Sequence, residues 1–557
     1  MASHNNGLVH QKNEIIRLFK SNQVEESYSK LLDLLEKHGE DAELYYLQGM
    51  MHGSRLRYAE ALKSFAHALE LKPNDGEVYF ELGLIELNLC RFNKAAGYVR
   101  KAKSLKCRVA ESESYFKKIN QQARPQDATL SVCLIVKNEE RHLANCLRSV
   151  QAIADQIVVV DTGSQDNTVA IATQFGAKIY HYAWQKDFAA ARNFANEQAT
   201  GDWILQLDAD EELFVEDQYK VREIIHRDDC SGAYLALHNR VSSSFGESKP
   251  TIHYLVRLYK NRPDFYYENA IHEILKISGE VKPVDINILH HGYNMQLDEM
   301  QNKRLRNAEI LYNRYKQNPD SVTTLFYLSM LHLGNREFEL AEAFANKVLE
   351  KIDESNIEKQ HLYLMTLNNL ALINLEKQNY TVAEAFCQRA ISKNENYLDP
   401  YYFLGVIHLR QSQPDKTKEI YEKYLAIYDR VARNPVFNLF ANSSMTYLFQ
   451  VYHTLGKIYR REQQLELAKA MFEKSIEINP KFWIACVDLG YLYGDLKDWQ
   501  MAERYLGRAI KMAKSNPSVN RSNQTIWFDF VNALKNYVRI LKQLPKQQYA
   551  HCHEHWY

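Results

Sequence analysis

The chain has 557 residues, enough for roughly three or four domains, and its hydrophobic share of 46% and charged share of 25% are ordinary for globular protein. Its 69 basic and 69 acidic side chains cancel, so charge gives no reason to expect a nucleic acid or an anionic membrane as partner. No apolar run reaches the ~18 residues of a membrane span, the first residues show no signal-peptide pattern, and the cysteines are scattered without a CxxC pair. This combination predicts a cytoplasmic protein with free thiols.

The N-terminal part of the chain, residues 1–125, contains an internal repeat. Residue types return after 34 positions, so that Tyr45, Gly49, Ala61 and Ala68 recur as Tyr79, Gly83, Ala95 and Ala102. Small residues at such positions let two helices pack closely, and a proline, Pro73, ends the second helix of the first copy. The pattern resembles the tetratricopeptide repeat family, whose helical hairpins stack into a solenoid with a concave face.

The period changes in the middle of the chain, at residues 129–300, after the polar linker 121–129. Short β-branched runs at 131–136, 157–160, 178–182 and 203–207 predict strands, and the stretches 140–151, 167–175 and 188–199 predict helices between them. Strands that alternate with helices in this way are typical of a parallel α/β sheet.

The repeat pattern returns in residues 301–540. One unit carries Gly456, Ala468 and Phe472, and the next follows 34 residues later with Gly490 and Ala502. These stretches again resemble tetratricopeptide repeats, which serve as scaffolds, as polypeptide-binding surfaces or as sites of homo-oligomer formation. The last residues, 541–557, are expected to be a disordered tail.

Carboxylates stand at the ends of two of the predicted strands. Asp161 ends the run IVVV, and Asp208 and Asp210 follow WILQL. Ligands bind beyond the carboxyl ends of strands in an open parallel sheet. Acidic groups at the end of an apolar strand require compensation, which a hard divalent cation carrying a diphosphate would supply. A D-x-D sequence alone is equally typical of a surface turn or a helix cap.

Three segments in order add to this reading: LSVCLIVKNEERHLANCLRSV, IVVVDTGSQDNTVAIA and WQKDFAAARNFANEQATGDWILQLDADEEL. Together with RLYK at 257–260, IHE at 271–273 and HHGY at 290–293, they resemble family-2 glycosyltransferases, which have the Rossmann-like GT-A fold. The combination with repeats is similar to bacterial protein glycosyltransferases of the sublancin type. The expected fold is therefore an α/β GT-A catalytic domain flanked by all-α tetratricopeptide-repeat solenoids.

The resemblance implies a site for a nucleotide-sugar, in the first place a UDP-sugar. Asn138 and Glu139, after the first strand, would lie beside the nucleoside, while Asp161 and Thr162 would face the uracil. Many family members have a second aspartate where this chain has Thr162. That departure bears on which base the site selects.

The resemblance also implies a Mn²⁺ or Mg²⁺ ion. Asp210 would bind the ion directly, and Asp208 would hold the ribose or a water on the ion. Arg192 would reach the nucleotide or its diphosphate, and the alternative is a salt bridge to Asp187. His290 would complete the metal site, with a structural histidine as the alternative. His291 is its rival for the metal.

An inverting transfer needs a base that takes the proton of the acceptor. The resemblance points to Glu273, with His272 as its orienting partner or as the base itself, and a structural role beside Arg257 or His272 is the alternative for Glu273. Asn269 stands where similar enzymes have a glycine, so the turn before His272 is expected to differ.

Three functions are compatible with these residues. The first is a metal-dependent, inverting glycosyltransferase that modifies an oxygen or sulfur of a polypeptide held by the repeats. The second is a glycosyltransferase for a surface or lipid-linked glycan. The third is a repeat adaptor whose transferase domain is inactive, which the intact Asp208, Asp210 and Glu273 disfavour.

Overall fold

The computed structural model describes residues 2–122, 126–239, 242–243, 246–247, 251–291, 297–352, 360–433, 443–516 and 524–543. The internal contacts divide the chain into two compact units: a first unit of Met1–Ala236 with Leu255–Leu289, and a second unit of Leu237–Tyr254 with His290–Tyr557. The N-terminal repeats and most of the predicted sheet thus fall in the first unit, and the C-terminal repeats fall in the second. The predicted tail lies outside the described residues from 544 onward.

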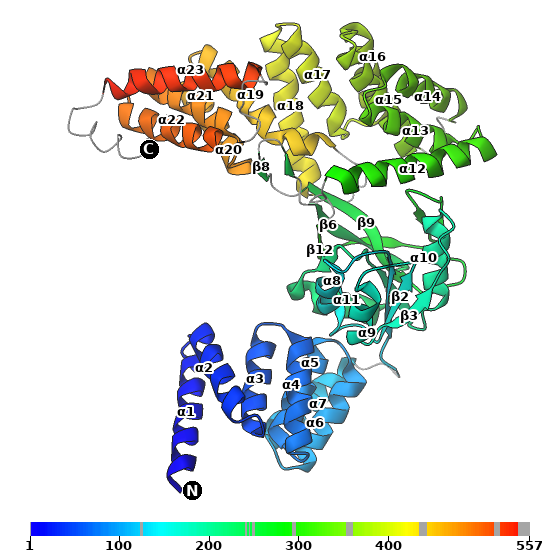
Figure 1. The fold of residues 1–557 in the computed structure, drawn as a ribbon, viewed down its shortest axis with the longest axis vertical. Coiled ribbons are helices and arrows are strands. Elements are labelled where there is room, and N and C mark those ends of the chain that lie inside the picture. The colour runs from blue at the N-terminus through cyan, green and yellow to red at the C-terminus, as the bar shows by residue number, and fades with distance from the viewer. Residues whose placement is uncertain are drawn as a thin grey trace. The chain divides into compact units, whose positions relative to one another are not determined.

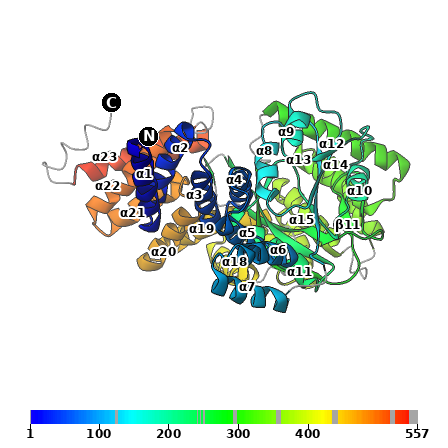
Figure 2. The ribbon, with the colours of Figure 1, turned by 90° about the horizontal axis from the view of Figure 1, so that it is seen from below.

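The N-terminal part of the first unit is helical, and α3 to α6 lie side by side in both views (Figures 1 and 2). Aspartates start two of these helices, because Asp41 accepts hydrogen bonds from backbone N–H groups of α3 and Asp75 does the same for α5. The helices are α1 (Ala2–Lys20), α2 (Val24–Lys37), α3 (Ala42–Ser54), α4 (Tyr58–Leu71), α5 (Gly76–Asn88), α6 (Phe92–Ser104) and α7 (Val109–Gln122).

The second unit contains the C-terminal helices, in agreement with the predicted repeats. They are α12 (Leu297–Gln317), α13 (Val322–Gly334), α14 (Phe338–Lys351), α15 (Gln360–Glu376), α16 (Tyr380–Lys393), α17 (Leu398–Arg410), α18 (Pro414–Arg433), α19 (Leu448–Arg461), α20 (Leu465–Ile478), α21 (Trp483–Asp495), α22 (Trp499–Lys514) and α23 (Gln524–Leu541). In the described part of the chain, their buried residues form two apolar cores, one that extends from Val322 to Tyr397 and a larger one from Ala371 to Leu541.

Glycines fix how closely the paired helices approach in both repeat blocks. A Cβ added to Gly49 would lie 2.4 Å from the ring of Phe65, and one added to Gly456 would lie 2.6 Å from the ring of Phe472. In each case the crowded side chain follows the glycine by the same interval in the sequence. The repeated spacing confirms the expected role of the small residues, since only glycine leaves room for that side chain.

The first unit also contains the predicted strands, as part of a larger mixed sheet. The order in the main sheet is β3-β2-β1-β4-β9-β6-β12-β5, with β1 parallel to β2 and β4, β2 parallel to β3, and β4 antiparallel to β9. The strands of the main sheet are β1 (Leu130–Val136), β2 (Gln156–Asp161), β3 (Lys178–His181), β4 (Trp203–Gln206), β5 (Glu211–Leu213), β6 (Gly232–Asn239), β9 (Thr251–Lys260) and β12 (Val281–His290). Two separate antiparallel pairs are β10 (Tyr266–Glu268) with β11 (Ile274–Lys276), and β7 (Ser242–Ser243) with β8 (Gly246–Glu247), the latter within the second unit.

Four helices accompany this sheet: α8 (Leu143–Val150), α9 (Thr168–Gln174), α10 (Phe188–Glu197) and α11 (Gln218–Arg227). The face of α10 with Ala189 and Ala195 packs in one apolar core with Cys133 of β1 and Val158 of β2. Asp187 starts α10, because its carboxylate accepts the backbone N–H of Ala190 at 2.9 Å. The helix is thereby fixed across the parallel strands.

A charge cluster of the buried Arg91 and Arg222 with the partly exposed Asp155 joins the N-terminal helices to the sheet. The Nη1 atom of Arg91, just before α6, donates to the carbonyl oxygen of Ala152 at 2.9 Å. Arg222 of α11 donates from Nη1 to Asp155 at 2.8 Å and from Nε to the carbonyl oxygen of Leu89. Both arginines are at most 5% exposed. The cluster therefore holds the repeats and the sheet together within the first unit.

Two expectations from composition concern the whole chain. Of the helices that the structure describes, none combines the length and apolar character needed to cross a membrane. The described cysteines, Cys90 to Cys486, are all free thiols, and Cys552 lies outside the described residues.

Candidate active site

Three polar segments meet at one edge of the sheet, because β1, β2 and β4 are parallel neighbours. Asn138 follows β1, Asp161 is the last residue of β2, and Asp208 follows β4. This is the edge at which open parallel sheets bind ligands, as the sequence predicts.

The loops after β1 and β2 are tied together by their own polar groups. Asn138 adopts a left-handed backbone with φ of 58° and accepts the backbone N–H of Gln165 at 2.8 Å. The backbone N–H of Glu139 donates to the hydroxyl of Thr168 at 2.7 Å. The hydroxyl of Thr162 donates to the carbonyl oxygen of Val136, so it is oriented toward the sheet.

Asp161 is 4% exposed and is held as an anion by its neighbours. Burial alone would raise its pKa, but hydrogen bonds from Ser164, His181 and the backbone N–H of Gly163 outweigh burial and lower the pKa below its ordinary value. The carboxylate is therefore charged at neutral pH and can only accept hydrogen bonds.

Asp208 sits between two guanidinium groups. Arg192 donates from Nη2 to Oδ1 at 2.7 Å, and Arg257 donates from Nη2 to Oδ2 at 3.0 Å. Burial would raise the pKa of Asp208, but the two positive charges hold it well below the ordinary range. Two arginines therefore supply positive charge that compensates the strand-end carboxylate of Asp208.

Arg257 of β9 also pairs with Glu211, which is 1% exposed. The second oxygen of Glu211 accepts the backbone N–H of Asp208 at 3.0 Å. Burial would lower the pKa of Arg257, yet the carboxylates of Glu211 and Asp208 raise it further above its usual value. Arg257 and Glu211 thus hold Asp208 in place from the interior of the domain. The sequence alone does not suggest this role for either residue.

Arg192 links Asp208 to Glu273, the predicted base. Its Nε donates to Oε1 of Glu273 at 2.6 Å, and its guanidinium carbon lies 5.6 Å from the centre of the Tyr267 ring. Arg192 is 5% exposed, and its Nη1 is buried without a hydrogen-bond partner among the described residues. The alternative partner Asp187 caps α10 instead.

The hairpin of β10 and β11 carries Glu273 and the exposed His272. Asn269 has φ of 74° and His272 has φ of 53°, both in the left-handed region. Asparagine tolerates this region better than most residues. Asn269 therefore adopts a backbone conformation that glycine also adopts readily. Asparagine in place of glycine does not by itself require a different turn before His272. The observed partner of Glu273 is Arg192, rather than the Arg257 of the structural alternative.

The predicted metal ligands are less completely assembled. Asp210 is half-buried next to Asp208. His290, at the end of β12, has Nδ1 2.6 Å from Oδ1 of Asn239; because an amide oxygen only accepts, Nδ1 carries the proton and a neutral ring has its lone pair at Nε2. In the part of the chain that the structure describes, no three His, Cys, Asp or Glu side chains are grouped to hold a metal ion.

The structure thus brings Asp208 and Glu273, which are far apart in the sequence, into contact with one residue, Arg192. Asn138 and Asp161 belong to the neighbouring cluster of loops. A signal for Arg257 was available, because an arginine inside the apolar run of β9 needs an acidic partner when it is buried.

Comparison with known families agrees with this architecture. Residues 131–280 match the family described as glycosyl transferase family 2. Residues 46–106, 449–482 and 485–516 match tetratricopeptide repeats. The chain therefore contains a family-2 glycosyltransferase domain between two blocks of repeats.

Relatives match parts of the chain. A TPR repeat-containing protein of Synechococcus elongatus is 42% identical over 148 residues, which cover 27% of this chain and 36% of that protein. An uncharacterized glycosyltransferase of Rickettsia felis is 41% identical over 107 residues, 19% of this chain and 38% of that protein. The prophage-derived glycosyltransferase SunS of Bacillus subtilis is 24% identical over 246 residues, 43% of this chain and 57% of that protein.

Similar solved structures include the MamA protein, with 17% identity and a TM-score of 0.27 over 35% of this chain and 93% of that chain. The TPR protein YrrB gives 16% identity and a TM-score of 0.28 over 37% of this chain and 93% of that chain.

Proposed function

We propose that this chain is an inverting glycosyltransferase that moves a sugar from a nucleotide-sugar, in the first place a UDP-sugar, to a polypeptide held by its repeats. One observation carries the proposal: at the ligand-binding edge of a family-2 glycosyltransferase domain, the buried Arg192 joins the strand-end carboxylate Asp208 to the candidate base Glu273. A donor site and an acceptor-activating group are then neighbours.

The nucleoside would lie over the loops after β1 and β2. There Asp161 is an anionic acceptor, and Asn138, Glu139 and Thr162 belong to the loops that surround it. The diphosphate would lie toward Arg192, whose buried Nη1 is a donor without a partner among the described residues. A planar guanidinium suits the paired oxygens of a diphosphate.

Charge supports metal dependence. The cluster around Asp208 holds three carboxylates and two guanidinium groups, with Asp210 beside it. An added diphosphate would make this surplus of negative charge larger, so a cation is expected to enter with the donor. Asp208 and Asp210 fit an ion whose remaining ligands are phosphate and water oxygens, which is how Mg²⁺ is usually held. When bound, Mn²⁺ or Mg²⁺ would neutralise charge on the departing diphosphate. For His290, or its rival His291, the support is the family resemblance.

Glu273 is the proposed base. Its side chain is 15% exposed and is oriented by the bond from Arg192, so a hydroxyl or thiol of the acceptor could reach it from solvent. The carboxylate would take the acceptor proton as the acceptor attacks the anomeric carbon from the face opposite the diphosphate. His272, exposed on the same turn, is the alternative base.

The donor site is tested by calorimetric titration of UDP into the protein, with and without Mn²⁺. We expect metal-dependent binding that is at least about tenfold weaker in Asp210→Asn. Glu216→Gln, which removes an exposed carboxylate nearby, is the matched control and should bind as the wild type does. Equal binding with and without metal would contradict metal dependence. Absence of binding to UDP, GDP and dTDP would favour the inactive adaptor.

The transfer step is tested separately with Glu273→Gln and His272→Gln. If Glu273 is the base, its variant should keep UDP affinity and lose about 10²- to 10⁴-fold in turnover. Mass spectrometry of co-expressed polypeptides would reveal the acceptor, and nuclear magnetic resonance of the product would show whether the anomeric configuration inverts. Sugar transfer only to lipid or surface glycan would refute the polypeptide acceptor.

A further inference from the structure

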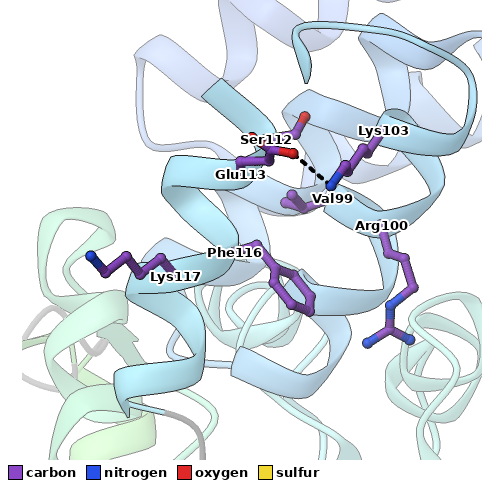
Figure 3. Close-up of a pocket in the computed structure, with 7 residues that line it drawn as sticks. All are labelled: Val99, Arg100, Lys103, Ser112, Glu113, Phe116 and Lys117. Carbon is purple, nitrogen blue, oxygen red and sulfur yellow. Dashed lines mark ion pairs between the residues drawn. The ribbon is translucent and has the colours of Figure 1, made fainter. Parts of the chain in front are cut away.

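A cavity of about 540 Å³ opens between α6 and α7, at the end of the N-terminal repeats (Figure 3). Its size is that of sites that hold a small ligand or a few side chains of a peptide. The lining residues are Val99, Arg100, Lys103, Ser112, Glu113, Phe116 and Lys117.

The wall of this α6–α7 cavity is apolar. Val99 is 1% exposed and Phe116 is half-buried, and both belong to the apolar cluster that holds α6 and α7 together. Figure 3 shows the Phe116 ring between the two helices with Arg100 beside it. The guanidinium carbon of Arg100 lies 5.5 Å from the centre of that ring. A branched or aromatic side chain could therefore be buried here under a cation.

The rim of the cavity is positively charged. Lys103 is neutralised by Glu113 at 2.8 Å, but the exposed Arg100 and Lys117 have no acidic partner among the described residues. The surrounding segment 92–118 holds eight basic and two acidic side chains, in a chain whose net charge is zero. This local surplus favours a negatively charged occupant.

The cavity is also held in place relative to the sheet. Arg91, the residue before α6, is fixed by the cluster with Asp155 and Arg222. The next residue, Phe92, has its ring centre 4.5 Å from that of His226 in α11. A segment bound between α6 and α7 would therefore keep a fixed position with respect to the sheet that carries Asp208.

We propose that the α6–α7 cavity binds an acidic polypeptide segment that inserts one apolar side chain beside Phe116. In the context of the proposed function, on which this role rests, the segment is a docking sequence of the polypeptide acceptor outside the residue that receives the sugar. Acidic side chains of the segment contact Arg100 and Lys117, and the apolar side chain packs on Val99 and Phe116.

A polypeptide explains the cavity better than a nucleic acid does. A phosphate backbone needs cations but no apolar cavity, whereas this cavity has Val99 and Phe116 in its lining. Phe116 is the one aromatic side chain among the described residues that line the cavity, and Arg100 lies beside its ring, so the cavity offers no series of rings on which successive bases could stack. An acidic segment with an apolar anchor uses both the wall and the rim.

The test is fluorescence anisotropy with the full chain and no donor present. The probe is a labelled twelve-residue peptide of alternating glutamate and glycine with a central leucine pair. Two comparison peptides replace either glutamate by glutamine or leucine by serine, and a twelve-nucleotide DNA strand is the fourth probe. The variant is Arg100→Glu with Lys117→Glu. The matched control, Lys20→Glu with Lys37→Glu, makes the same charge change at exposed positions of α1 and α2.

We expect the probe to bind the wild type and the control alike, and to bind the Arg100/Lys117 variant at least about tenfold more weakly. Each comparison peptide should also lose affinity. Equal binding by variant and wild type, or DNA binding that is stronger than peptide binding and lost in the variant, would overturn the proposal. Because no sugar is transferred in this assay, a protein that binds the peptide without transferase activity would contradict the proposed function and leave this site standing.

Discussion

The ion pairs of Arg257 with Asp208 and Glu211 allow us to predict how much stability the chain loses when Arg257 is replaced. Replacing Arg257 by methionine keeps the volume of the side chain but removes the cation that holds Glu211 and Asp208. Asp208 keeps Arg192 as a partner, with its side chain 34% exposed. Glu211, by contrast, is 1% exposed and loses a cation with which it is paired in the interior. The cost of the substitution therefore falls on Glu211.

Removing one partner of a buried ion pair costs about 3 to 5 kcal/mol. We expect the lower end, about 3 kcal/mol, because Glu211 keeps the hydrogen bond from the backbone N–H of Asp208, and Asp208 keeps Arg192 as its cation. Replacing both partners, in Arg257→Met with Glu211→Gln, leaves no unpaired charge and should cost less than about 1.5 kcal/mol. The exposed pair of Arg262 and Asp264 is the control, and Arg262→Met should cost about 0 to 1 kcal/mol.

Hydrogen exchange is the suitable assay, because a chain of several domains does not unfold in one step. Amide protection in β4 and β9 should fall about 150-fold in Arg257→Met, the factor that corresponds to about 3 kcal/mol. The double variant should recover most of the protection, and the helices α19 to α22 should exchange as before. A double variant as unstable as the single one, or a single variant within about 1 kcal/mol of the wild type, would refute the reasoning.

Three further predictions concern the rest of the chain. Asp155→Asn should weaken the attachment of α6 to the sheet by about 2 to 4 kcal/mol, because Arg222 then lacks its anion; the measurement is hydrogen exchange in residues 91–104. Burial would raise the pKa of Asp155, but Arg222 and Arg91 lower it. The stabilisation is therefore present above the unfolded pKa of about 4, and in an acid titration of the same exchange it should be lost as the pH falls from there through the lowered pKa of the folded state. Gly456→Ala should lower the stability of α19 and α20, measured by hydrogen exchange, by about 1 to 3 kcal/mol, since its new methyl group would lie 2.6 Å from the ring of Phe472. As a control, Gly53→Ala should stabilise its helix slightly, because an added methyl group there meets nothing within 4 Å.

The secondary structure of the catalytic domain could be predicted closely. The run Ile157–Val160 became β2, Gln156–Asp161, all of it buried, because a short β-branched run with both faces apolar is typical of the interior of a parallel sheet. The repeats could be predicted for a related reason. Gly49 and Gly456 have no alternative where a ring from the paired helix crosses them, so the spacing is visible in the sequence.

The contacts within the site could not be predicted in the same way. Acidic residues at strand ends show that compensation is required, and the sequence suggested a divalent cation for it. Arg192 and Arg257, which the sequence did not suggest together as partners of Asp208, also compensate it, and they reach Asp208 from 16 and 49 residues away in the sequence. These contacts join different elements and do not repeat along the chain, so no periodic pattern in the sequence reveals them. Only the packing of α10 and β9 against β4 places these arginines at the end of that strand.

The use of Arg192 for two carboxylates explains why a lysine would not serve there. Nε binds Glu273 and Nη2 binds Asp208, so two separate edges of one planar group hold two acids at once. The remaining nitrogen, Nη1, is buried and without a partner in the described structure. The guanidinium group can therefore donate to a third acceptor without releasing the two carboxylates. An ammonium group has no such fixed division of its donors. The geometry of a single guanidinium therefore couples the proposed donor site to the proposed base.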